Sequence, residues 1–159
     1  MPHTLRPELE RFRHWLGLWR GPGTMGDGTE VLLEFSIRPL FEGAGLEFTS
    51  SALDKATGAN LSTGLGFWGV DDQGKVVAGI YTPELGPVQM HEVPDDPSGV
   101  CIEALVPGNV RFIVALIMEG QELVMATRRQ QGYAGQGTPI TSGTMRRVTP
   151  SWRSPGVTP

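Results

Sequence analysis

Apolar and polar residues alternate in this chain from near residue 30 almost to the end. In the first such stretch, apolar residues stand at every second position and most of their neighbours are polar: Val31, Leu33, Phe35 and Ile37. A period of two is typical of a β-strand with one buried face and one solvated face. The same pattern predicts nine strands, at residues 29–38, 44–53, 60–70, 75–82, 87–93, 99–106, 109–118, 121–130 and 139–148.

The links between these strands are short and contain glycine, and the chain has 22 glycines and 13 prolines among its 159 residues. Parallel neighbours need long crossover connections, so we expect an antiparallel meander. Closure into a barrel removes the exposed edges that an open sheet would keep. We therefore predict an all-β fold, a single antiparallel up-and-down barrel of nine or ten strands, with a β-sandwich as the alternative.

One helix precedes the strands. Apolar residues recur there at intervals of three and four: Leu5, Leu9, Phe12, Leu16 and Trp19. This spacing places them on one face of a short helix, predicted over about residues 7–16, and that face would close one mouth of the barrel. Residues 1–148 then form one domain, and the proline-rich stretch 149–159 is expected to be a loose tail.

Charge and cysteine content limit the partners and the compartment. The chain has 13 basic and 17 acidic residues, a formal net charge of −4, which disfavours broad binding of nucleic acid. No apolar run approaches the ~20 residues of a membrane helix, and the N-terminus lacks the apolar core of a signal peptide. The single cysteine, Cys101, excludes an internal disulfide and fits a reducing cytoplasm. We expect a cytoplasmic protein without nucleic-acid or membrane partners.

A glycine-rich motif follows the helix: residues 17–23 have the spacing G-x-W-x-G-x-G. Its glycines let the backbone approach a neighbour closely, and Trp19 is expected to pack at the end of the barrel. Helix, motif and meander together resemble the lipocalin-like (calycin) barrels, in particular the nitrobindin-like haem-binding barrels and their uncharacterised bacterial relatives. Residues 40–47 and 64–71 are similar to the bacterial branch, and the resemblance spans about residues 5–148.

The resemblance implies a haem whose iron is held by a histidine on the last strand. The matching stretch here, residues 139–148, contains no histidine, and Ile140 or Thr141 stands about where the ligand is expected. Neither an alkyl group nor an alcohol replaces an imidazole nitrogen as a normal haem ligand. We therefore expect the barrel without the cofactor. A nitrobindin-like haem protein that acts on reactive nitrogen species is the alternative function.

Other chemistry is sparse. The three histidines share no metal-ligand spacing and Cys101 has no nearby sulfur partner, so we predict no metal site. We identify no catalytic constellation. Besides the nitrobindin-like haem protein, the alternative enzyme is a cofactor-free isomerase that uses His91 and Glu103. Another alternative function is an interaction module with a filled core. The chain could also form a homodimer.

A non-enzymatic binding barrel is the function that this sequence favours. Barrels of this size leave room for one small ligand, here apolar or amphipathic. Arg128 or Arg147 would hold an acidic head group, because a guanidinium matches the two oxygens of a carboxylate. The expected ligand-binding residues, with Phe67 and Trp68 as alternatives to each other, are Trp19, Phe35, Phe67, Trp68, His91, Phe112, Met125, Arg128 and Arg147.

Overall fold

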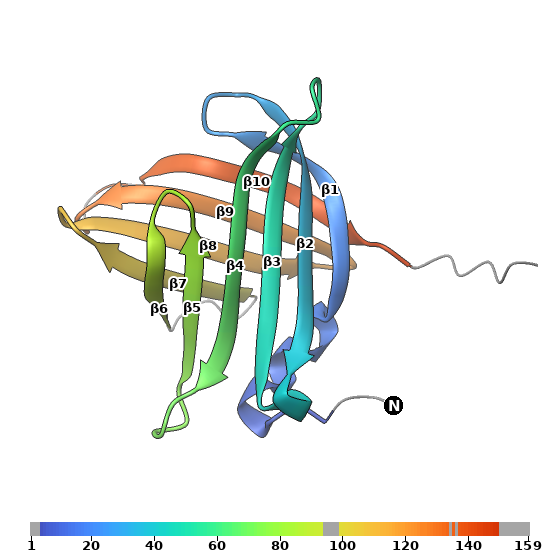
Figure 1. Ribbon diagram of the computed structural model, residues 1–159, viewed down its shortest axis with the longest axis vertical. Helices are drawn as coiled ribbons and strands as arrows, with labels where there is room; N and C mark the ends of the chain where they lie inside the picture. Colours follow the sequence, from blue (N-terminus) through green and yellow to red (C-terminus); the bar gives the residue numbers. More distant parts are fainter. Residues whose placement is uncertain (1–3, 94–98, 134, 136, 150–159) are drawn as a thin grey trace, which may run out of the picture.

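The computed structural model describes residues 4–93, 99–133, 135 and 137–149, and within them ten antiparallel strands form a closed barrel (Figure 1). The strands are β1 (Gly17–Met25), β2 (Glu30–Leu40), β3 (Gly45–Asp54), β4 (Asn60–Val70), β5 (Val76–Thr82), β6 (Gly86–Glu92), β7 (Gly99–Val106), β8 (Val110–Glu119), β9 (Glu122–Gln131) and β10 (Thr138–Arg147). Each strand pairs with its neighbours in sequence, and β1 also pairs with β10. The predicted barrel is confirmed, and the sandwich alternative is excluded.

The nine predicted strands correspond to β2 through β10, with ends that differ by no more than two residues. The tenth strand, β1, was not among the predicted ranges. It is the glycine motif itself, in which Gly17, Gly21, Pro22 and Gly23 leave too few side chains for an alternation to be visible. Trp19 is nevertheless buried there.

The glycines of β1 allow the barrel to close. A Cβ atom at Gly21 would lie 2.0 Å from the backbone oxygen of Thr144 on β10. Gly23 is the register partner of Gly143, where a Cβ atom would lie 2.4 Å from the backbone oxygen of Pro22. Because no side chain fits at these positions, the first and last strands approach more closely than ordinary residues permit. We call this contact the closure seam.

The predicted N-terminal helix is present as a 3-10 helix, η1 (Pro7–Trp15), which the chain leaves through Gly17 at φ +124°. Its apolar residues Leu9, Phe12 and Trp15 are at most 2% exposed, and the ring centroid of Phe12 lies 4.8 Å from that of Trp68. The helix therefore closes one end of the barrel, as expected (Figure 1).

The remaining features of the fold are a second short helix and the end of the chain. A second 3-10 helix, η2 (Phe41–Gly43), links β2 to β3, and neither described helix is long and apolar enough to cross a membrane. Of the expected tail at 149–159, all but Thr149 lies outside the described residues.

Candidate ligand-binding cavity

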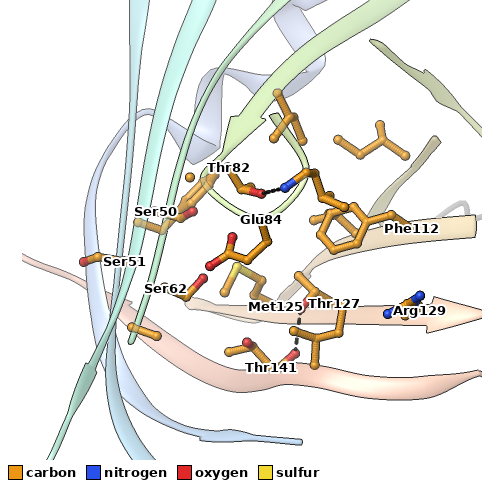
Figure 2. A pocket seen from close by; sticks show the side chains of 18 of the residues that line it. Ser50, Ser51, Ser62, Thr82, Glu84, Phe112, Met125, Thr127, Arg129 and Thr141 are labelled. Atoms are coloured by element: carbon orange, nitrogen blue, oxygen red, sulfur yellow. Dashed lines mark hydrogen bonds between the residues drawn. The ribbon is translucent and has the colours of Figure 1, made fainter. Parts of the chain in front are cut away.

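The barrel contains a cavity of about 590 Å³ (Figure 2). Its lining includes Met25 at the end of β1, Thr82 at the end of β5 and Val110 at the start of β8, which are the strand ends away from η1. At the other end, Trp68 lines the cavity and contacts the helix. The cavity thus runs from an open mouth to a floor that η1 seals.

Apolar side chains form the floor and most of the walls. They come from the inward-facing positions of successive strands: Leu33, Phe35, Phe48, Ile80, Ile102, Leu116 and Met125. The rings of Phe35 and Phe48 lie 5.9 Å apart between centroids, and Phe48 lies 5.7 Å from Trp68. These three rings give the floor a continuous aromatic surface.

Hydroxyl groups lie nearer the open mouth of the cavity. Thr127 Oγ1 donates to the backbone oxygen of Thr141 at 3.4 Å, and Thr82 Oγ1 accepts from the backbone N–H of Leu85 at 3.2 Å. The hydroxyls of Ser50 and Ser62 have no hydrogen-bond partner in the described part of the chain. They are therefore available to a ligand.

Two charged residues complete the described lining: Glu84, in the turn between β5 and β6, and Arg129, near the end of β9. Neither side chain forms an ion pair or a hydrogen bond with another described residue. Figure 2 shows the Glu84 carboxylate extending into the pocket toward Ser62, with Arg129 on the far side of Thr127. The mouth thus carries one charge of each sign.

Of the expected binding residues, Phe35, Trp68, Phe112 and Met125 line the cavity. Phe67 does not. The alternation of β4 turns Trp68 inward and leaves Phe67 on the outer face, 55% exposed.

Trp19 and Arg147 lie beside the helix instead of in the lining. Trp19 is 1% exposed, and its Nε1 donates to the backbone oxygen of Trp15 at 2.8 Å. The guanidinium of Arg147 donates to the backbone oxygens of Leu16 and His14. Both residues hold the closed end of the barrel together.

The remaining two expected residues are outside the lining as well. Arg128 and Arg129 are both exposed, and Arg129 is the arginine of this strand that lines the cavity, at its mouth. His91 is exposed and pairs in register with Glu103, whose carboxylate binds Arg111. The pair required by the isomerase hypothesis therefore does not meet in the cavity.

Sequence reasoning missed Arg129, Glu84 and the two serines. The sequence could have identified Arg129, because Arg129 and Met125 are four positions apart on the same strand and alternation places them on the same face. Glu84 gave no signal, since turn residues follow no period.

The lining does not fit a histidine-ligated haem. It contains Ile140 and Thr141, the two positions at which the resemblance places the iron ligand, and no described lining residue is a histidine, cysteine or tyrosine. The soft donors present are the thioethers of Met25 and Met125, and the Thr141 hydroxyl donates to Met25 Sδ at 3.5 Å. No cluster of three metal-ligating side chains exists among the described residues.

Fold and cavity together define a closed antiparallel β-barrel with an interior pocket. No known family model and no curated protein matches the sequence. In fold the chain is similar to Rv2717c from M. tuberculosis, with a TM-score of 0.69 and 18% identity over 92% of this chain and 100% of that one. A de novo designed fluorescence-activating β-barrel matches at a TM-score of 0.44 and 13% identity over 90% of this chain and 100% of its own. The likeness to Rv2717c shows the fold alone.

Proposed function

We propose that this chain is a non-enzymatic binding barrel that holds a small, largely apolar ligand in its interior cavity. The observation that carries the proposal is the cavity of about 590 Å³ with apolar walls and a few polar groups. Ligand pockets typically have volumes of roughly 300–1,000 Å³ and this division between apolar walls and a few polar groups. A ligand that covers these apolar walls removes them from water, which is favourable in proportion to the apolar area covered.

The lining supports binding rather than catalysis. It offers serine and threonine hydroxyls, but no described lining residue is a histidine or a lysine that would activate them, and none is a cysteine nucleophile. An acidic group on the ligand would meet Arg129 at the mouth. From the helix and the glycine-rich motif that follows it, we also propose that the chain is a lipocalin-like barrel. From its single cysteine, Cys101, we propose that it is cytoplasmic.

Nile red, whose emission rises in apolar surroundings, tests the proposal. We expect it to bind with a stoichiometry of one. Thr127→Phe places a ring in the cavity and should weaken binding by at least about tenfold, since filling the site removes the contact area of the probe. Ala126→Phe is the matched control, because Ala126 is the exposed neighbour on the same strand. Equal binding to the two variants, or none to the parent, contradicts the proposal.

A further inference from the structure

Polar and apolar groups are separated along the axis of the cavity. Met125, Thr127 and Arg129 all line the cavity from β9, and burial falls from Met125, which is buried, to Arg129, which is exposed at the mouth. At about 3.3 Å per residue, Arg129 stands roughly 13 Å beyond Met125. On β4, Ser62 precedes Trp68 by six residues, or roughly 20 Å. The charged side chains therefore lie at the open end, together with hydroxyls and some apolar residues, and the closed end is aromatic.

The two charges at the mouth are of opposite sign, yet they are not paired. Elsewhere on the barrel, neighbouring opposite charges do pair, as in Arg146 with Glu122 at 2.8 Å and Arg20 with Glu34 at 2.6 Å. Glu84 and Arg129 make no such contact with each other or with any described residue. Both are left for a ligand or for water.

We infer that the ligand is a single-chain amphiphile with a zwitterionic head, bound with its chain toward Trp68 and its head between Glu84 and Arg129. This inference rests on the proposed function. A purely anionic head is attracted by Arg129 but repelled by Glu84, and a purely cationic head is attracted by Glu84 but repelled by Arg129. A head that carries both charges gains from both residues, and the free hydroxyls of Ser50 and Ser62 lie on the Glu84 side (Figure 2).

The orientation follows from desolvation. In the reverse pose the charged head would lie among Phe35, Phe48 and Trp68, where no described lining residue offers a charged partner. Burying charges without partners is costly, whereas the same floor is a favourable surface for a hydrocarbon chain. The chain therefore enters first and the head stays at the mouth.

Four competitors with nearly the same hydrocarbon chain and different heads test this: lauroylcarnitine (zwitterion), laurate (anion), dodecyltrimethylammonium (cation) and dodecanol (neutral). Each displaces Nile red from the parent, from Glu84→Gln and from Arg129→Met, below its micelle concentration. We expect lauroylcarnitine to bind the parent most tightly and to lose about fivefold in each variant, since single exposed charge pairs contribute modestly. Glu84→Gln should bind laurate more tightly than the parent does, and Arg129→Met should bind the cation more tightly.

Matched controls are Arg128→Met, the exposed neighbour on β9, and Glu42→Gln in η2, and both should leave all four affinities unchanged. If dodecanol or laurate binds the parent as tightly as lauroylcarnitine does, or if Glu84→Gln leaves the zwitterion unaffected, the inference is overturned while the binding barrel stands. If neither Nile red nor any competitor binds, the proposed function itself fails.

Discussion

The guanidinium of Arg147 lies over the indole of Trp19, 4.6 Å from the ring centroid, and joins the last strand to the first strand and the helix before it. The same group donates to the backbone oxygens of Leu16 and His14 at the end of η1. The last carbonyls of a helix lack partners within it, so these bonds satisfy them. The last strand, the first strand and the helix that seals the floor are thus held at one point.

Replacing Arg147 with Met should lower the free energy of unfolding by about 1–3 kcal/mol, because two hydrogen bonds and a cation–π contact are lost. Arg146→Met is the control. Arg146 is exposed and pairs with Glu122 at the surface, so its loss should cost less than about 1 kcal/mol. Urea unfolding measures both, and equal effects would contradict the role given to Arg147.

Trp19→Ala should cost about 3–5 kcal/mol, since the indole is fully buried in the core. Trp19→Phe should cost less, because it retains most of the apolar contact and loses the bond to the Trp15 carbonyl. Leu105→Ala, at a side chain 61% exposed, should change stability by no more than about 0.5 kcal/mol. A thermal midpoint for Trp19→Ala equal to that of the parent would show that the indole does not support the floor.

Gly21→Ala should destabilise the closure seam by more than about 2 kcal/mol, because the new methyl group meets the backbone of Thr144 and that backbone must move. Gly69→Ala on β4 is the matched control, since nothing lies within 4 Å of a Cβ atom there. Unfolding in guanidinium compares the two. A Gly21 variant as stable as the Gly69 variant would mean that the seam tolerates side chains.

The turn between β3 and β4 should give stability a dependence on pH. Hydrogen bonds from the backbone N–H groups of Thr57 and Ala56 lower the pKa of Asp54. A carboxylate with a lowered pKa stabilises the fold fully above its unfolded pKa of about 3.9, and this contribution is lost as the pH falls through the folded value. Asp54→Asn should therefore melt below the parent at neutral pH, and the difference should shrink below about pH 4.

Asp72→Asn provides the comparison for that experiment, because the Asp72 carboxylate has no hydrogen bond to a described residue. Its midpoint at neutral pH should equal that of the parent. A gap between Asp54→Asn and the parent that stays constant into acid would show that the charge at Asp54 contributes nothing.

Haem titration tests the alternative function. We expect no shifted Soret band that saturates at one equivalent in the parent, because no imidazole stands in the described lining. Thr141→His tests the reason, since Thr141 already lines the cavity. If the missing ligand is the obstacle, that variant gains the band. A saturating band in the parent would restore haem as a cofactor.

The alternation in the sequence predicted β2 through β10, because each has one face in the core and one in solvent. It failed for β1, where the requirement for close approach replaced side chains with glycine. The helix was predicted in place but not as a 3-10 helix, since both helix types bring residues three apart near one another. Glu84 and the size of the cavity depend on packing between distant strands, which no local pattern encodes.

The closure seam also determines at which stage of folding the cavity forms. Gly23 and Gly143 are register partners although they lie 120 positions apart in the chain. Pairing over such a distance is slow, because loop-closure entropy must be overcome before the first and last strands make contact. On a ribosome, every strand from β1 to β9 emerges before the partner that completes the wall. A nascent chain that lacks β10 therefore presents two unpaired edges and no enclosed pocket.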